Sequence, residues 1–291
     1  MHLTDTIFEL LGENADTTPR LLDKKAQEKY YTKIVDRYMS FCSDAGKRDE
    51  LLRRFANLSK MDDGAATAQK GVTGMPKLSP EALQDQTNNR SLASVMMALR
   101  KLREGIVGSN RADAFSVQAY LFNIRTSILV KQPESYHPAM LHLLNTMHMT
   151  HPLTATELQE VATYLILDTA CRRNDLADAY MLRKRYKIRD SKLDMALGAL
   201  VHDNWVRFRE AKSRVDGHQV RIMDFAEDEM RLRALKCFGR TYLSVDLSYL
   251  EDVTERRWEE LREKDGVGWE LDGEKVVIRR VKAKPVAAEG G

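Results

Sequence analysis

Apolar residues recur every three or four positions through most of this 291-residue chain, a spacing that places them on one face of an α-helix. The first stripe follows Thr18-Pro19, a capping hydroxyl and a proline whose φ angle suits the first helical turn. It contains Leu22, Ala26, Tyr30, Ile34, Tyr38 and Phe41. The pattern predicts a long amphipathic helix that ends near Cys42. It belongs to an N-terminal helical segment over residues 1–58, to which "KRDELLRRFANL" adds a short second helix.

The helical pattern stops between Ser59 and Pro80. The stretch "SKMDDGAATAQKGVTGMPKLSP" is rich in Gly, Ala and Thr, and it has too little apolar surface to offset the entropy lost on ordering. We therefore expect a flexible linker over residues 59–80.

From residue 81 to residue 224 the helical pattern resumes and hardly pauses. Capping signals separate its stripes, and these signals are Thr154 to Glu157, Asn174, Ser191 to Asp194, and the break at Asp203-Asn204. Short antiparallel helix pairs are each too small to bury their own apolar faces, so they stack on their neighbours. The prediction for 81–224 is a helical-repeat domain, a right-handed solenoid without a fixed sequence period.

The stretch "GWELDGEKVVIRR" predicts two strands and a tight turn. Asp272-Gly273 tolerates the positive φ angles of a two-residue type I′ turn. That turn would pair Leu271 with Glu274 and Trp269 with Val276, giving the hairpin one apolar and one polar face. Because an isolated hairpin is marginally stable in water, its apolar face must pack on the residues before it.

Those preceding residues predict a helix in "EDEMRLRALKCFGRTY", a short edge strand in "LSV", a helix capped by Asp246, and a helix from Thr254 to Gly266. Helix, strand, two helices and a hairpin is the order of a winged-helix domain, in which the hairpin is the wing. The sequence thus predicts a mainly α chain, with a solenoid capped by a C-terminal winged helix over 225–282. A disordered tail follows over 283–291.

Helical hairpins that run directly into a winged helix resemble the PCI domain, the module shared by the proteasome lid, the COP9 signalosome and translation initiation factor three. The resemblance covers about Thr154 to Lys282, and the segment "ALGALVHDNWVRFREA" is most similar to the small-subunit and mRNA-export branch. Residues before Ser79 match no pattern of that family. The resemblance implies a non-catalytic subunit that packs against other, PCI-containing subunits through its winged helix.

Composition agrees with an intracellular globular protein, in the nucleus or the cytoplasm. Hydrophobic residues make up 43% and charged residues 31% of the chain, and no apolar run is long enough for a membrane helix. The first residues lack the basic region of a secretory signal. Cys42, Cys171 and Cys237 are few and far apart, which favours a reducing compartment.

The sequence shows no motif that points to an enzyme. It contains no phosphate-binding Gly-rich loop, no nucleophile elbow and no zinc-protease helix. His142, His148 and His151 are close in sequence, but they do not share one helical face, and Pro152 breaks the geometry. We expect no catalytic residue, no metal, no cofactor, no small-molecule substrate and no membrane.

Net charge is only +3, from 46 basic and 43 acidic residues, so local charge decides what the surface can bind. Two groups of basic residues stand out, and they are Arg172, Arg173, Arg183, Lys184, Arg185, Lys187 and Arg189 in the repeats and Lys275, Arg279 and Arg280 in the hairpin. They suit salt-sensitive binding of RNA or single strands, in which Tyr180 and Tyr186 would stack on bases, although tyrosines at helical spacing are more often core residues. An acidic partner subunit, or an ordinary solvated face, is the alternative.

The helix "ERRWEELREK" has four acidic residues among ten, which argues against reading duplex DNA in the major groove. The sequence therefore favours a scaffold or adaptor subunit of a multiprotein complex. The residues expected at its docking surface are Trp258, Leu261, Trp269, Val276 and Ile278. An adaptor for RNA or single-stranded nucleic acid is the alternative function.

Overall fold

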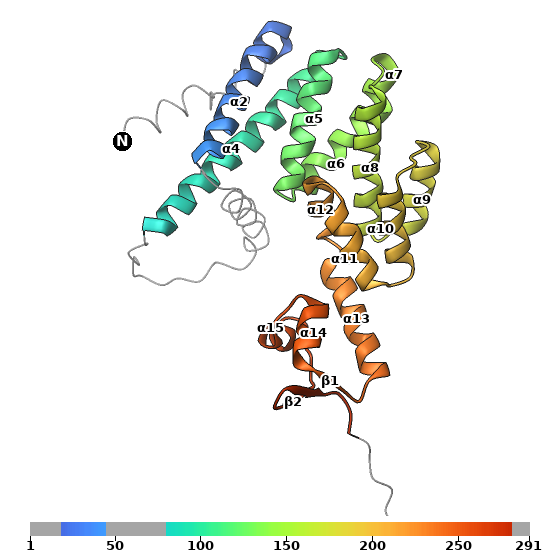
Figure 1. Ribbon diagram of the computed structural model, residues 1–291. Helices are drawn as coiled ribbons and strands as arrows, with labels where there is room; N and C mark the ends of the chain where they lie inside the picture. The colour runs from blue at the N-terminus through green and yellow to red at the C-terminus, as the bar shows by residue number, and fades with distance from the viewer. Residues whose placement is uncertain (1–18, 45–79, 281–291) are drawn as a thin grey trace, which may run out of the picture. The chain divides into compact units, whose positions relative to one another are not determined.

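The computed structural model describes residues 19–44 and 80–280, and these residues are mainly helical, as predicted (Figure 1). The helices of the first half are η1 Pro19–Leu22, α2 Lys24–Asp44, α4 Pro80–Gly108, α5 Ala114–Leu129, α6 Pro133–His142, the π-helix η2 Leu143–Met147, α7 His148–Thr150 and α8 Ala155–Cys171. Those of the second half are α9 Leu176–Arg185, α10 Ser191–Val201, α11 Trp205–Arg214, α12 Gly217–Met223, α13 Glu227–Thr241, α14 Leu247–Thr254 and α15 Trp258–Glu263. The strands are β1 Ser244–Asp246, β2 Glu270–Asp272 and β3 Lys275–Val277.

The chain forms two compact units, Met1–Leu165 and Ile166–Gly291. We call them the N-terminal unit and the C-terminal unit. The boundary lies inside α8, and therefore inside the range 81–224 that the sequence predicted as one domain. The short helix expected in "KRDELLRRFANL", most of the linker, and the C-terminal tail lie outside the described residues. Helix α4 begins at Pro80, the last residue assigned to the linker.

In the N-terminal unit a buried cation joins α2 to the start of α5. The guanidinium of Arg111 forms ion pairs with Glu28 at 2.6 Å and with Asp113 at 2.7 Å, and its side chain is only 4% exposed. Asp113 also caps α5 by accepting a hydrogen bond from the Ser116 amide. A buried charge needs such partners, because an unpaired one is costly to desolvate. Arg111 therefore fixes how α2 packs against the α4–α5 turn.

The first predicted helix is interrupted. A 3₁₀ turn, η1, ends at Leu22, and Asp23 accepts a hydrogen bond from the Ala26 amide at 3.0 Å to start α2. The turn packs closely on α4 at Gly105, where an added Cβ would come within 2.8 Å of the Leu21 carbonyl oxygen. Glycine is the residue that allows this approach.

Capping side chains set the helix boundaries in the C-terminal unit. At two helices the capping residue is the neighbour of the residue that the sequence predicted. Asp175 caps α9 in place of Asn174, which takes a left-handed φ of 54°. Asp190 caps α10 in place of Ser191, and the break at Asn204 is confirmed. Each of these carboxylates also interacts favourably with the dipole of the helix that it caps. The box at Thr154 and Glu157 forms as predicted.

A three-stranded antiparallel sheet with strand order β1-β3-β2 lies at the end of the C-terminal unit. Its central strand β3 packs Val276 into a core that α13, α14 and α15 complete. The buried members of that core are Leu235, Phe238, Val245, Leu250, Trp258, Leu261 and Val276. The hairpin thus packs on the preceding helices, as the sequence indicated.

The predicted hairpin turn is displaced by one residue, so the predicted strand register is wrong by two residues. Leu271 pairs with Val276, and Asp272 pairs with Lys275, so Gly273 and Glu274 are the turn residues. Of the possible turn residues only Gly273 has a positive φ, 62°. Positive φ at the first central position alone is typical of a type II′ turn, which requires glycine there, whereas type I′ requires positive φ at both. Leu271 consequently lies on an exposed edge, 44% accessible.

Helix α15 is shorter than predicted. Thr254 does not open it, because its hydroxyl donates to the Leu250 carbonyl and ends α14 instead. The chain then passes through Glu255 in a left-handed conformation, and α15 begins at Trp258. The carboxylate of Glu251 accepts a hydrogen bond from the Trp258 amide at 2.7 Å. The first turn of α15 is thereby capped from α14.

Candidate interaction surfaces of the C-terminal unit

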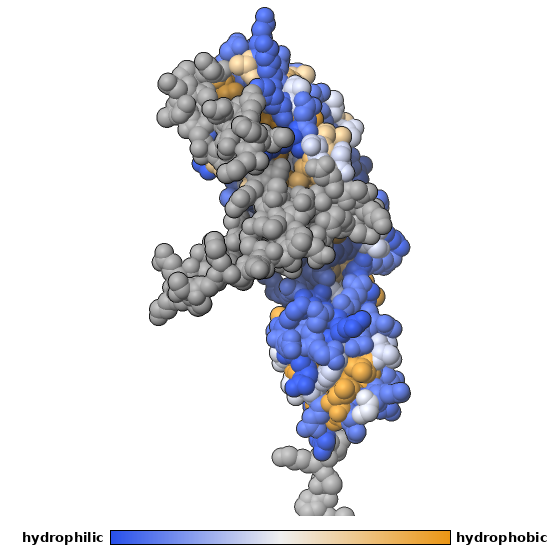
Figure 2. Space-filling view, turned by 90° about the vertical axis from the view of Figure 1, so that its left-hand side faces the viewer, coloured by the Kyte–Doolittle hydropathy of each residue, from blue (hydrophilic) through white to orange (hydrophobic). Residues whose placement is uncertain are grey.

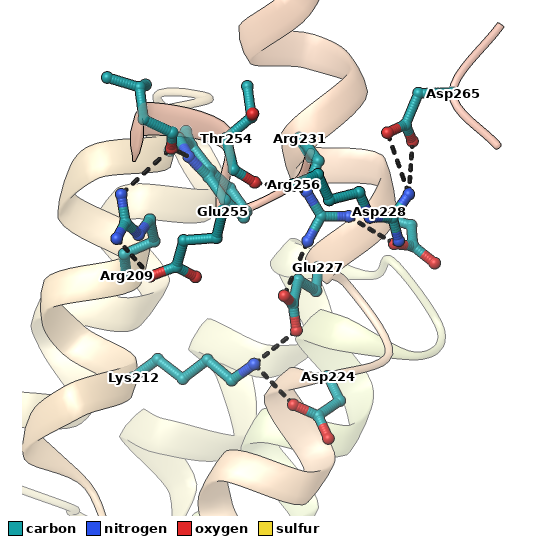
Figure 3. A network of polar contacts seen from close by, with 12 residues as sticks. Arg209, Lys212, Asp224, Glu227, Asp228, Arg231, Thr254, Glu255, Arg256 and Asp265 are labelled. Carbon is teal, nitrogen blue, oxygen red and sulfur yellow. Dashed lines mark hydrogen bonds and ion pairs between the residues drawn. The ribbon is translucent and has the colours of Figure 1, made fainter. Parts of the chain in front are cut away.

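A polar network ties α11 and α13 to the α14–α15 turn (Figure 3). The indole nitrogen of Trp205 donates to the Val253 carbonyl at 2.6 Å, and Nη1 of Arg209 reaches the same carbonyl at 3.1 Å. Arg209 also pairs with Glu255. Both donors come from α11 and meet the carbonyl groups at the end of α14, which have no partner within their own helix.

Arg231 is the most buried cation of this network. Its Nε donates to the Thr254 carbonyl at 2.9 Å, and its two terminal nitrogens pair with Asp228 and Glu227 at 2.6 and 2.8 Å. The side chain is 3% exposed, and its guanidinium lies 5.2 Å from the centre of the Trp205 ring. A single side chain of α13 therefore contacts α11 and α14.

The remaining charges of the network are also paired. Lys212 lies 2.7 Å from Asp224 and also pairs with Glu227, while Arg256 contacts Asp228 at 2.6 Å and Asp265 at 2.9 Å. Burial would lower the pKa of Lys212, but its hydrogen bonds to the two carboxylates outweigh burial and raise that pKa. Each carboxylate is thus held by a cation. The network therefore holds the α14–α15 turn on α11 and α13.

Some basic residues of the repeats form ion pairs with carboxylates, and others form none with a described residue. Arg172 forms a bidentate pair with Asp168, and Arg183 pairs with Asp194, both at 2.7 Å, while Arg173 lies 3.9 Å from Asp178. Four exposed cations at the end of α9 and just after it form no ion pair with a described residue, and these are Lys184, Arg185, Lys187 and Arg189. We call these four the α9 basic edge. Tyr180 of α9 is 41% exposed, and Arg185 stacks on Tyr186 at 5.6 Å.

The basic residues of the hairpin form a separate group. Arg279 donates to the Arg240 carbonyl at 2.7 Å, Arg280 pairs with Glu270 at 2.7 Å, and Lys275 is exposed without an ion pair to a described residue. Figure 1 draws α9 and the sheet far apart within the C-terminal unit, with α11 and α13 between them. The structure therefore does not bring the two predicted basic groups into one site.

The residues expected at the docking surface are core residues. Leu261 and Val276 are fully buried and Trp258 is 6% exposed, while Trp269 and Ile278 are half-buried against the same core. A domain this small needs its largest apolar side chains inside. A partner would instead meet exposed neighbours of this core, which sequence analysis missed.

Three exposed neighbours lie beside the edge strand β1. Tyr242 and Tyr249 flank the ring of Phe238, at 5.5 and 6.2 Å, and they are 44% and 52% exposed. Leu243 between them is 51% exposed, and its carbonyl accepts hydrogen bonds from the amides of Ile278 and Arg279. We call Tyr242, Leu243 and Tyr249 the β1 patch. The feature of the sequence that could have pointed to these residues is their position close to a strand of only three residues.

Figure 2 shows a hydrophobic strip on the C-terminal unit near the end that carries the sheet, and further hydrophobic areas on the N-terminal unit. Exposed apolar groups beside polar ones are typical of surfaces that bind another protein. On α15 the acidic residues remain exposed, and Lys264 lowers the pKa of Glu260 through a hydrogen bond. That helix therefore presents negative charge.

In residues 19–44 and 80–280 no cluster of three or more His, Cys, Asp or Glu side chains could hold a metal ion. Two of the three histidines singled out in the sequence make separate contacts. His148 accepts a hydrogen bond from the Leu153 amide at 3.0 Å, and His142 stacks on Tyr120 with ring centres 5.2 Å apart. Of the helices that the structure describes, none has the length and apolar character needed to cross a bilayer.

Comparison with known proteins does not assign this chain to a family. No protein-family model matches it, and no curated protein matches it significantly.

Proposed function

We propose that this protein is a non-catalytic scaffold or adaptor subunit, which docks partner proteins through the β1 patch at the sheet end of its C-terminal unit. The observation that carries the proposal is the exposure of Tyr242, Leu243 and Tyr249 next to an edge strand. An edge strand has backbone groups free to pair with another chain, and exposed tyrosines are frequent at the centres of protein interfaces.

Rigid support strengthens this proposal. Trp205 and Arg231 hold the end of α14, the helix that carries Tyr249, on α11 and α13, so this part of the β1 patch has little freedom to lose when a partner binds. Pre-organised surfaces bind more tightly because less conformational entropy is lost. The order α13, β1, α14, α15, β2, β3 is that expected of a winged helix, and a PCI-like arrangement of helical repeats and winged helix remains part of the proposal.

RNA or single-stranded nucleic acid is the second candidate partner, and the α9 basic edge favours it. Lys184, Arg185, Lys187 and Arg189 are exposed and unpaired among the described residues, and Tyr180 is exposed nearby on the same helix. Free cations release counterions when they contact phosphates, and an exposed ring can stack on a base. The same edge also suits an acidic protein partner.

Affinity purification of the tagged protein from its own cells, with and without nuclease, tests both candidates. Under the scaffold proposal a stoichiometric set of proteins survives nuclease and is lost in a Tyr242→Asp, Tyr249→Asp double variant. A Lys184→Glu, Arg185→Glu variant lowers the net charge by four units on another surface, against two units for the double tyrosine variant, and it should keep those proteins.

Partners that disappear with nuclease, and are lost in the Lys184→Glu, Arg185→Glu variant, would replace the scaffold proposal with the nucleic-acid adaptor. Arg183 is left unchanged in this design because it pairs with Asp194, and its reversal would also disturb the fold. Retention of all partners by both variants would exclude both surfaces.

A further inference from the structure

An open pocket of about 450 Å³ lies in the N-terminal unit, lined by residues of α4, α5 and α6. Its wall combines the apolar side chains of Val107, Pro138 and Ala139 with the polar groups of Arg103, Tyr120 and His142 and with the ion pair of Arg100 and Glu104. A mostly apolar wall with a few polar groups is typical of small-molecule sites, which usually measure about 300–1,000 Å³.

Arg103 is a cation without a counter-ion in this pocket. Its Nη1 donates to the Ser135 carbonyl at 2.8 Å, its Nε is buried without a partner, and the guanidinium forms no ion pair with a described residue. The neighbouring carboxylate, Glu104, is already paired with Arg100 at 3.0 Å. Burial lowers the pKa of Arg103, yet arginine stays charged at neutral pH. The side chain is half-buried, and a partly desolvated charge without a counter-ion has capacity for an anion.

Tyr120 and His142 add two further groups with unused hydrogen-bonding capacity. The Tyr120 side chain is 2% exposed, and its hydroxyl bonds to no described residue. His142 stacks on that ring, and no hydrogen bond joins its imidazole to a described residue. The π-helix η2 begins at the next residue, Leu143, and such segments are frequent at functional sites.

We infer that this pocket binds a small organic anion, whose phosphate or carboxylate group takes hydrogen bonds from Arg103 and Tyr120 while its apolar part lies against Val107 and Pro138. Charge-assisted hydrogen bonds from arginine to these groups are among the strongest in proteins. The inference concerns a ligand of the N-terminal unit, and it does not depend on the proposed docking function.

Isothermal titration calorimetry of the full chain tests the inference with three probes: phenyl phosphate, benzoate and inorganic phosphate. We expect saturable binding of phenyl phosphate or benzoate, and weaker binding of inorganic phosphate because it lacks the apolar part. Arg103→Gln should weaken binding roughly tenfold or more, the usual effect of losing one charge-assisted hydrogen bond. Lys236→Gln removes one positive charge from the exposed surface of the C-terminal unit, and it should leave affinity unchanged.

Tyr120→Phe is the second variant, because Arg103→Gln also removes the bond to Ser135 and can affect folding. The phenylalanine keeps the buried ring and its stacking on His142, and it removes only a hydroxyl that has no partner among the described residues. We expect a several-fold loss of affinity without loss of structure. A preference for phenyl phosphate over benzoate, or the reverse, identifies the anion.

Three results would overturn the inference. They are no saturable binding of any probe, equal affinity in the wild type and both pocket variants, or an equal loss of affinity in Lys236→Gln. Inorganic phosphate binding as tightly as phenyl phosphate would overturn the apolar half of the site.

Discussion

The indole nitrogen of Trp205 on α11 donates a hydrogen bond of 2.6 Å to the carbonyl of Val253 on α14, 48 residues further along the chain. This bond joins the helical part of the C-terminal unit to the segment that supports the sheet. The side chain of Trp205 is 3% exposed and stacks on Phe208 at 6.2 Å. It thus provides packing and a directional polar contact at the same point.

Replacing Trp205 by Phe should destabilise the C-terminal unit. The variant loses the hydrogen bond and leaves a small cavity, which together cost roughly 1–3 kcal/mol. Urea unfolding followed by circular dichroism measures the change. Val206→Ala is the matched control, because Val206 is the next residue on α11 and is 66% exposed, so its free energy of unfolding should change by less than about 0.5 kcal/mol. Equal losses in the two variants would show that the bond to Val253 is unimportant.

Arg231 and Arg233 on α13 should differ strongly in their importance. Arg231→Met leaves the buried Thr254 carbonyl without its donor and removes one of the two cations that hold Glu227 and Asp228, a loss of charge-assisted hydrogen bonds that costs about 1.5–3 kcal/mol. Arg233 also pairs with two carboxylates, Asp203 and Glu229, but its side chain is 30% exposed against 3% for Arg231.

Solvent screens the Arg233 pairs, so Arg233→Met should cost less than about 1 kcal/mol. Thermal unfolding of both variants at one salt concentration checks the comparison. A larger loss in Arg233→Met than in Arg231→Met would contradict the structure of the network.

Gly273 and Gly198 should respond to alanine with opposite signs. Gly273 has a φ of 62° in the hairpin turn, so Gly273→Ala should destabilise the sheet by roughly 1 kcal/mol, the cost of a left-handed conformation. Gly198 lies inside α10, and an added Cβ there meets nothing within 4 Å. Gly198→Ala should therefore stabilise the unit by roughly 0.5–1 kcal/mol. Chemical denaturation of the two variants tests both signs, and stabilisation by Gly273→Ala would rule out the turn described above.

Helix positions could be predicted from the sequence because a 3.6-residue period is local information. The stripe of Leu92, Val95 and Leu99 is buried as its spacing required. Helix ends were less certain where two capping residues are adjacent, as at Asn174 and Asp175. The hairpin register depended on which two of three residues, Asp272, Gly273 and Glu274, form the turn. Strand β3 also pairs with β1, where Val276 lies opposite Val245, 31 residues earlier, and no local pattern signals that pairing.

The candidate sites were harder to predict, because they depend on pairs distant in sequence. No period relates Trp205 to Arg231 or Arg103 to Tyr120, yet each pair meets across helices. The sequence placed apolar residues near the sheet, such as Leu261, at a docking surface. Their burial depends on how the whole unit packs, which no local pattern shows. The β1 patch instead uses Tyr242 and Tyr249, which flank a buried ring and remain exposed.

Stability of the N-terminal unit should depend on the protonation of His142. Burial, and then the charge of Arg103, lower the pKa of this imidazole below its ordinary value of 6.5. The charged groups around it are Arg100, Arg103 and Glu104 from α4. Tyr120 from α5 does not titrate near neutral pH, because burial raises its pKa to about 12. Between the folded and unfolded pKa values of His142, the unfolded chain binds more protons. The free energy of unfolding therefore falls as the pH falls below about 6.5.

A His142→Phe variant isolates this contribution, since phenylalanine can keep the stacking on Tyr120 but cannot take up a proton. Urea unfolding of the wild type and the variant, measured between about pH 7 and about pH 5, covers the range in which histidine titrates. Carboxylates titrate in both proteins, so the informative quantity is the difference between the two stabilities at each pH. We expect the wild type to lose stability relative to His142→Phe as the solution becomes acidic. A constant difference over this range would show that His142 has the same pKa in the folded and unfolded chain, and a difference of the opposite sign would show that folding stabilises its protonated form.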